Sequence, residues 1–155
     1  MISPEILKRY PFFGKLDDKQ LKQIALISEE VSFKKGEVIF EECEIAEHLY
    51  MLTQGSIELF YKTAEDSATK TRQEIFIAHL DPVDVFGVSS VIEPYYLNST
   101  AKAITKVSCI RIEAAGLRQL FEADAKLSCR MMTQIAKELM QRLIAVQTQL
   151  AAAQS

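Results

Sequence analysis

The middle of the chain alternates apolar and polar residues in short runs, and this pattern limits the possible folds most strongly. It extends from Val31 to Ile112, and turn residues end the individual runs. A period of two is typical of β-strands with one buried face. Glycine suits the turns because it adopts positive φ without steric cost, and the turn glycines are Gly36, Gly55 and Gly87. Many short strands predict a jelly roll or barrel, whose closed sheets leave few exposed edges.

The segments on both sides of this region have helical spacing. Apolar residues recur at helical intervals from Pro4 to about Glu30, with a break at Pro11, which predicts two short helices. Two further helices are predicted over residues 113–122 and 125–150, the second without Gly or Pro and rich in helix formers. We therefore expect a single domain over residues 1–155, made of N-terminal helices (1–30), a β region (31–112) and C-terminal helices (113–155).

The last predicted helix carries two apolar faces. One face repeats at alternating intervals of four and three residues, as in the seam of a coiled coil: Met132, Ala136, Leu139, Leu143, Val146 and Leu150. A second set, Met131, Ile135 and Ile144, is expected to pack on the β region. Because one β region cannot cover both faces, the sequence predicts a homodimer through the first seam.

Composition and charge exclude several classes of protein. Hydrophobic residues make up 48% and charged residues 25%, as in an ordinary globular protein. The net charge of −3 argues against broad nucleic-acid binding, which needs a cationic face. No apolar run approaches the roughly 20 residues that span a bilayer, and the N-terminus does not resemble a signal peptide. We expect a cytoplasmic protein without a membrane contact, whose three cysteines stay reduced.

Four segments resemble the cyclic nucleotide-binding domain family. The segments are residues 33–40 (FKKGEVIF), 46–59 (AEHLYMLTQGSIEL), 84–87 (DVFG) and 100–105 (TAKAIT). The resemblance implies a mostly β fold with flanking helices: a double-stranded β-helix, or jelly-roll-like β-roll, with short N-terminal helices and a long C-terminal helix. It also implies a parallel pair of C-terminal helices.

The resemblance places a phosphate-binding cassette between the last two of these segments. Its candidate ligand-binding residues are Gly87, Val88, Ser89, Ser90, Leu97, Asn98, Ser99 and Thr100. The family uses a glutamate after the first glycine for the ribose, where this chain has Val88. It uses an arginine for the cyclic phosphate, and the matching position here is Leu97 or Asn98, depending on the direction of counting. The family's hydroxyl-bearing adenine contacts correspond to Arg142 and Leu143.

The cassette therefore lacks its charge-assisted contacts but keeps neutral donors. Backbone N–H groups after Gly87 can form an anion-binding nest, with serine, threonine and asparagine side chains beside it. A cyclic nucleotide such as cyclic AMP or cyclic GMP, or another small anion, remains a candidate ligand, and no cofactor is certain.

Two functional interpretations stay open at this point. In the first, the protein is a stand-alone regulatory sensor that signals through the dimer interface of its C-terminal helix. In the second, it is a ligand-free interaction or dimerisation module, with the roll filled by its own residues: Val88, Ile92, Tyr95, Tyr96 and Leu97. Either interpretation allows a protein partner. Direct DNA binding is not expected, because the chain stops at Ser155 without the helix-turn-helix of gene-regulating relatives.

An enzymatic role is not expected. His48 and His79 lie in separate predicted strands without a ligand triad, which argues against a metal-dependent jelly roll. No serine or cysteine lies in a recognisable nucleophile motif, and the glycines form no phosphate loop. The sequence therefore predicts neither catalytic residues nor metal ligands.

Overall fold

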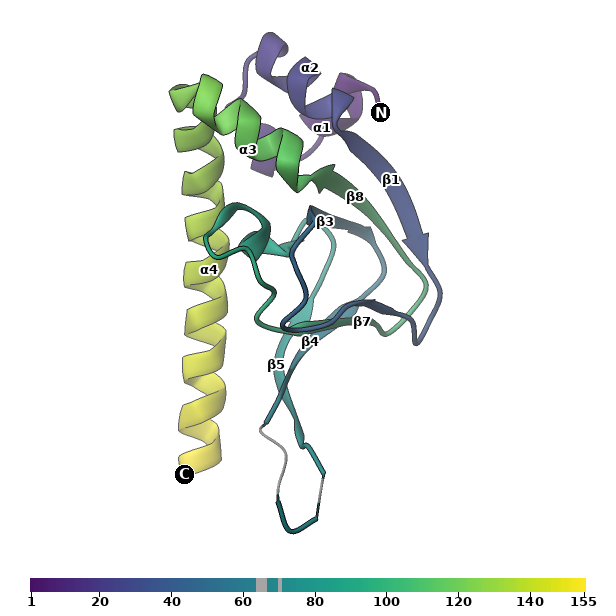
Figure 1. Cartoon of the computed structure of the whole chain (residues 1–155), viewed down its shortest axis with the longest axis vertical. Helices are drawn as coiled ribbons and strands as arrows, with labels where there is room; N and C mark the ends of the chain where they lie inside the picture. The colour runs from purple at the N-terminus through teal and green to yellow at the C-terminus, as the bar shows by residue number, and fades with distance from the viewer. Residues whose placement is uncertain (64–66, 70) are drawn as a thin grey trace.

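The computed structural model describes residues 1–63, 67–69 and 71–155, and shows short helices, two β-sheets and a long C-terminal helix (Figure 1). The elements, with η1 and η2 as 3-10 helices, are α1 (Pro4–Lys8), η1 (Pro11–Phe13), α2 (Asp18–Leu26), β1 (Ser28–Phe33), β2 (Val38–Phe40), β3 (His48–Gln54), β4 (Ile57–Lys62), β5 (Glu74–Leu80), β6 (Val85–Phe86), η2 (Val88–Val91), β7 (Thr100–Ala103), β8 (Val107–Glu113), α3 (Ala114–Ala123) and α4 (Ala125–Gln154).

Two antiparallel sheets of four strands each face one another and form the roll. The strand order is β1-β8-β3-β6 in the first sheet and β2-β7-β4-β5 in the second. Buried side chains from both sheets meet between them and include Phe40, Tyr50, Leu52, Ile57, Leu59, Leu80, Phe86, Ala101, Val107 and Cys109. The predicted fold, a jelly-roll-like β-roll with short N-terminal helices and a long C-terminal helix, is confirmed.

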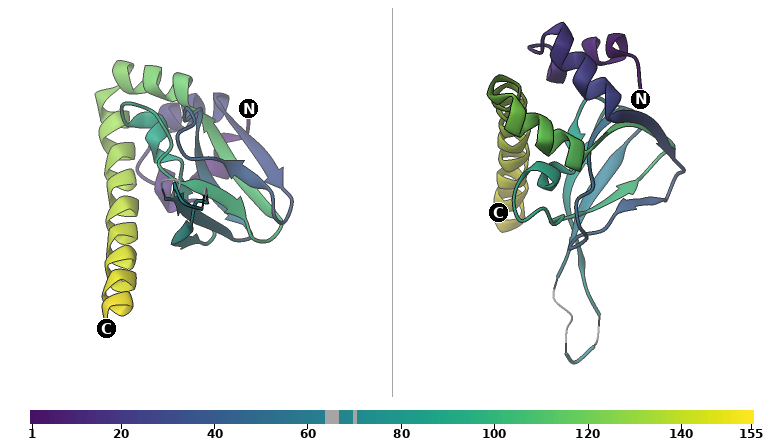
Figure 2. Two further views of the ribbon diagram at one scale, coloured as in Figure 1. Left: turned by 60° about the horizontal axis from the view of Figure 1, so that its bottom comes forward. Right: turned by 45° about the horizontal axis from the view of Figure 1, so that its top comes forward.

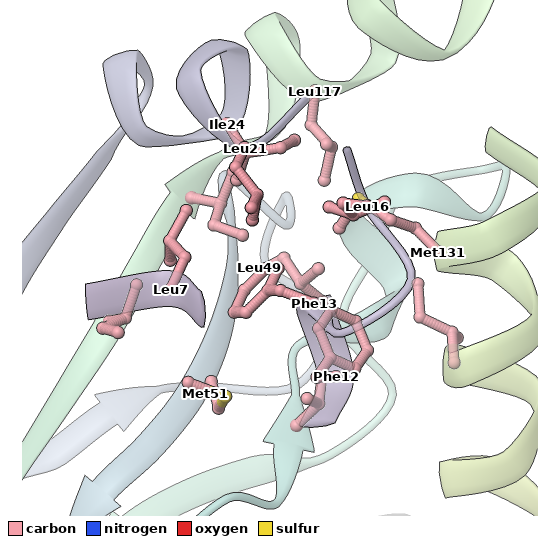
Figure 3. Packing of buried hydrophobic residues seen from close by; sticks show 14 of the residues in the cluster. Leu7, Phe12, Phe13, Leu16, Leu21, Ile24, Leu49, Met51, Leu117 and Met131 are labelled. Carbon is pink, nitrogen blue, oxygen red and sulfur yellow. The ribbon is translucent and has the colours of Figure 1, made fainter. Parts of the chain in front are cut away.

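β3, an inner strand of the first sheet, is buried on both of its faces. Along β3, Tyr50 and Leu52 belong to the interior of the roll, while Leu49 and Met51 belong to a second core on the other face. Helices cover this second core, and its members include Leu7, Phe12, Phe13, Leu16, Leu21, Ile24, Leu117, Leu127, Met131 and Ile135 (Figure 3). The first part of α4 is therefore a core element of the fold.

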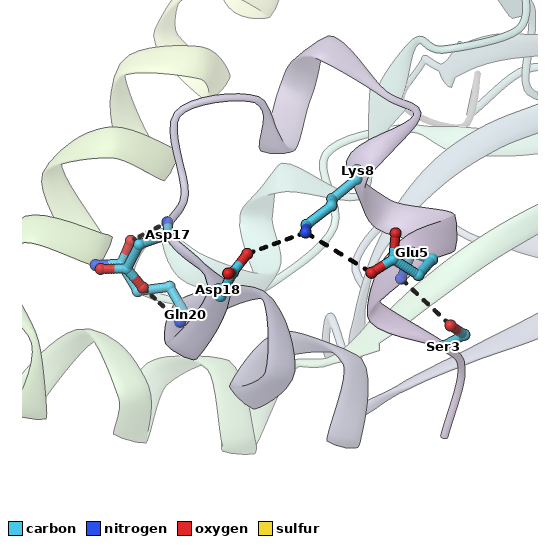
Figure 4. A network of polar contacts seen from close by, with 6 residues as sticks. All are labelled: Ser3, Glu5, Lys8, Asp17, Asp18 and Gln20. Atoms are coloured by element: carbon cyan, nitrogen blue, oxygen red, sulfur yellow. Dashed lines mark hydrogen bonds and ion pairs between the residues drawn. The ribbon is translucent and has the colours of Figure 1, made fainter.

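Polar contacts fix the N-terminal helices and join them to the start of α4. The Asp17 carboxylate accepts a hydrogen bond from the Gln20 backbone N–H at 2.8 Å, within a capping box that begins α2 (Figure 4). The Gln20 side chain donates to Asp124 at 3.1 Å and accepts from Arg130 at 2.8 Å. These contacts anchor α4 at the end where it begins.

Two predictions from apolar spacing are wrong. The spacing predicts helix for residues 28–30, but Ser28 already begins β1, because this segment pairs in register with β8, Ser28 opposite Ile112. Ile144 does not pack on the roll, and its side chain is 55% exposed. Nine residues separate Ile144 from Ile135, which is two and a half helical turns, so the two side chains lie on opposite faces of α4.

The hairpin loop predicted over residues 63–72 includes 64–66 and 70, which lie outside the described residues. On either side of it, β4 and β5 pair antiparallel from Ile57 opposite Leu80 to Lys62 opposite Glu74. None of the described helices has both the length and the apolar character needed to cross a membrane.

Candidate functional site

The segment predicted as a ligand cassette, residues 87–100, runs from β6 through η2 to β7 (Figure 2). It begins at Gly87, whose φ of 71° falls in the left-handed region. A Cβ at this position would lie 2.9 Å from the His48 carbonyl oxygen and 3.2 Å from the Tyr50 ring. The chain therefore needs glycine here both for its conformation and for its close approach to β3.

The predicted ligand-binding residues divide between buried and exposed positions. Val88 lies at the position of the family's glutamate, and Leu97 is one of the two candidate positions for its arginine. Their side chains are only 8% and 7% exposed. The remaining side chains are placed as follows: Ser90, Ser99 and Thr100 are buried, Ser89 is half-buried and Asn98 is exposed. Thr100 Oγ1 accepts a hydrogen bond from the Glu42 backbone N–H at 3.3 Å, and the buried Ser90 hydroxyl has no partner among the described residues.

Two arginines lie beside the cassette, and both are already bound. Arg118 of α3 donates to the Ser90 carbonyl oxygen at 3.0 Å, and its guanidinium stacks 4.2 Å above the centre of the Tyr95 ring. Arg142 of α4 donates to the Val85 carbonyl oxygen at 2.8 Å. The sequence singles out Arg142, but it carries no signal for the Arg118–Tyr95 contact, which joins residues in different elements.

A groove of about 340 Å³ runs between β5 and the distal half of α4. Its charged lining residues are Asp84, Glu138 and Arg142. Burial, followed by the nearby Asp84 carboxylate, raises the pKa of Glu138. The groove contains two carboxylates, and the Arg142 guanidinium is already hydrogen-bonded to a backbone carbonyl oxygen. An anion should therefore bind here more weakly than beside an arginine whose N–H groups are free.

Aromatic side chains from the strands fill the interior of the roll. The rings of Tyr50 and Phe86 stack with their centroids 5.0 Å apart, and Phe40 lies 5.9 Å from Phe86. Of the residues predicted to plug the roll, only Leu97 is buried in its interior; Val88 is buried instead in the second core, on the other face of the first sheet, and Tyr95 is half-buried. Ile92 and Tyr96 lie on the surface, 38% and 54% exposed.

The histidines occupy separate positions. His79 Nε2 lies 3.2 Å from the Asp81 carboxylate on the surface, and His48 is half-buried at the start of β3. Within the part of the chain that the structure describes, no group of three or more His, Cys, Asp or Glu side chains is placed to hold a metal ion.

The predicted dimer seam begins in the part of α4 that packs on the helical core and continues beyond it. Met132 is half-buried against the helical core. The later large members of the seam are exposed by 37–57%: Leu139, Leu143, Val146 and Leu150. Ala136 is exposed as well. The described residues therefore leave the distal part of this seam open to solvent.

A model of the cyclic nucleotide-binding domain matches residues 30–124. The chain is 23% identical over 135 residues to the CRP-like cAMP-activated global transcriptional regulator of Mycobacterium tuberculosis, which covers 87% of this chain. It spans 58% of the length of that regulator.

Solved structures agree with this match. A Geobacter metallireducens protein, provisionally described as a cyclic nucleotide-binding protein, is 41% identical and has a TM-score of 0.80. That alignment covers 92% of this chain and 99% of the other. The sensor domain of the transcriptional regulator DNR from Pseudomonas aeruginosa is 20% identical, with a TM-score of 0.70 and coverage of 90% and 89%, and shares the fold.

Proposed function

Since the chain belongs to the cyclic nucleotide-binding domain family, we propose that it is a ligand-independent regulatory module that dimerises through α4. The observation that carries this proposal is the state of the cassette. Val88, in place of the family's glutamate, and Leu97, one of the two candidate arginine positions, are buried among the protein's own side chains, while Asn98, the other candidate position, is exposed and uncharged. The cations next to it, Arg118 and Arg142, are bound to backbone carbonyl oxygens.

Recruiting Arg118 to a cyclic phosphate would have a clear cost. Its charged hydrogen bond to Ser90 is of a type that contributes about 1.5–3 kcal/mol. Its cation–π contact with Tyr95 adds about 0.5–2 kcal/mol. A nucleotide would have to offset both losses before it gained net affinity, and it would find Val88 where the family's carboxylate accepts the ribose hydroxyl. These costs favour a cassette that stays closed without ligand.

Such a module would act by dimerising through the exposed seam of α4. The alternating intervals of four and three residues make this face complementary to a second copy of itself. The seam residues that are exposed in the single chain, Leu139, Leu143, Val146 and Leu150, are those that a two-helix coiled coil would bury. The three free cysteines fit a protein of the reducing cytoplasm.

Two measurements test the proposal together. Thermal unfolding is followed with cyclic AMP, cyclic GMP and other nucleotides in millimolar excess, and the oligomeric state is measured by sedimentation equilibrium. We expect an unchanged melting temperature and a reversible dimer. A ligand present at 100 times its Kd stabilises the native state by about 2.7 kcal/mol, which shifts Tm by roughly 5–10 °C for a chain of this size. A saturable shift of that size would refute ligand independence.

One observation favours a sensor as the second candidate. Arg142 and Gln149 of α4 both line the groove beside β5, and Gln149 donates to the Ile77 carbonyl oxygen at 3.1 Å. A small ligand in this groove would compete for the polar contacts that hold α4 against the roll and would change the angle of the helix. A ligand-induced Tm rise together with a changed dimer constant would favour this candidate over the first.

A further inference from the structure

A second pocket lies at the mouth of the roll, built by elements other than α4. It has a volume of about 320 Å³ and is lined by Ile39, Phe40, Glu44, Ile45, Ala46, Glu47, His48, Tyr50 and Leu97. Backbone hydrogen bonds fix its rim, because the segment before β3 runs antiparallel to the end of the cassette. Ala46 N–H donates to the Tyr95 carbonyl oxygen, and Leu97 N–H donates to that of Glu44, both at 2.8 Å. The pocket is therefore preformed.

The floor of the pocket is apolar, and apolar side chains continue onto the surface around it. Phe40, Tyr50 and Leu97 are buried where they line it. On the rim, Ile45 and Tyr96 face each other across an isolated β-bridge and are 63% and 54% exposed. Paired exposed aromatic and aliphatic side chains beside a pocket are a common feature of protein interaction sites.

The polar part of the rim is acidic. Glu44 and Glu47 line the pocket, and neither forms an ion pair with any lysine or arginine that the structure describes. Their neighbour Glu41 is different, because it lies 3.9 Å from Lys62 Nζ. Burial lowers the pKa of His48, so its ring is neutral near pH 7 and does not compensate the two carboxylates.

We propose that this pocket docks a short basic segment of a partner protein, with one apolar side chain on Phe40 and Tyr50 and flanking Lys or Arg side chains on Glu44 and Glu47. The charge of the rim selects a cationic partner. The apolar surface of Ile45 and Tyr96 extends beyond the pocket, which favours a peptide over a small organic cation. The site shares no lining residue with α4, so this inference goes beyond the proposed dimer and does not depend on it.

The probe is a capped synthetic peptide with one central leucine flanked on each side by two arginines or lysines. Binding to the ¹⁵N-labelled full chain is followed by amide chemical shifts, and the expected changes lie in residues 39–50 and 95–97. Peptides with serine in place of leucine, or glutamate in place of the basic residues, serve as controls and should bind at least tenfold more weakly.

Charge-neutral variants then test the rim. Glu44→Gln and Glu47→Gln should each weaken binding about three- to fivefold, as for exposed ion pairs, while Glu122→Gln on α3 should not change it. The Glu44 carboxylate accepts from the Glu41 backbone N–H at 3.0 Å. The glutamine side chain of the Glu44→Gln variant keeps an oxygen that can accept the same hydrogen bond, so the rim should keep its shape.

Several results would overturn the proposal: no binding at millimolar peptide, shifts centred on the groove beside α4, or equal affinity for the serine control. If free arginine produced the same shifts as the peptide, the pocket would be a site for small cations. Higher oligomers that disappear on Glu47→Gln would instead identify a second copy of this chain as the occupant.

Discussion

Replacing Leu143 by alanine should weaken the α4 dimer about thirtyfold. The Leu143 side chain is 52% exposed in the single chain. Full burial of a leucine contributes about 1.5–3 kcal/mol, so covering the exposed half adds about 1 kcal/mol. A two-fold dimer contains the residue twice, which gives about 2 kcal/mol, or a factor of about thirty in Kd. Sedimentation equilibrium over a wide range of chain concentrations measures this change directly.

The substitution should leave the single chain intact, because alanine is at least as good a helix former as leucine. Leu26→Ala is the matched control, since Leu26 is 64% exposed at the end of α2, far from the seam in the chain and on another element. Unchanged dimerisation in Leu143→Ala, or an equal loss in the control, would show that the seam does not mediate association. A monomeric parent chain at the highest concentrations would have the same meaning.

Three further results are expected. Gly55→Ala should destabilise the fold by more than about 2 kcal/mol in urea unfolding, because φ at Gly55 is 90° and a Cβ would lie 2.3 Å from the Lys106 carbonyl oxygen. The control Gly36→Ala has a similar φ but open space around the Cβ, so it should cost only about 1 kcal/mol, and equal losses in the two variants would contradict the steric argument. Burial raises the pKa of Cys109 to about 12, so a thiol reagent at mild alkaline pH should modify only the two exposed cysteines of the native protein. Rapid modification of all three cysteines would contradict this. Because the pKa of Glu138 is raised in the folded state, its contribution to stability is complete below the ordinary carboxyl pKa of 4.5 and is lost as pH rises through the folded-state pKa. In urea unfolding measured against pH, Glu138→Gln should therefore reduce the fall in stability over this pH range, and an unchanged fall would show that the carboxylate is in water.

The roll could be predicted from the sequence because local and long-range requirements agree there. Alternation at the start of β4, where Ile57 and Leu59 are buried, matches the pleat, and the positive φ values of Gly36, Gly55 and Gly87 lie where the turns were predicted. The start of β1 was harder to predict from the sequence. Residues 28–30 fit a helical spacing, and only their pairing with β8, at the far end of the β region, makes them a strand.

The state of the cassette could be predicted only in part. The sequence alone shows that Val88 stands in place of the family's glutamate and that the arginine position holds Leu97 or Asn98. The engagement of Arg118 with Ser90 and Tyr95 is a tertiary contact, and the spacing of Arg118 within α3 contains no trace of it. The pocket beneath Ile45 likewise depends on how two loops pair.

α4 is anchored unevenly along its length. The helix has 30 residues, and its buried side chains all lie in the first half, ending at Ile135. Beyond that point it is tied to the roll by the hydrogen bonds of Arg142 and Gln149. Helical segments without a packed face are marginal in water and open readily to amide hydrogen exchange. In a dimer that covers the seam, folding of the distal half and association become one cooperative event, so that dilution alone would fray the end of the helix.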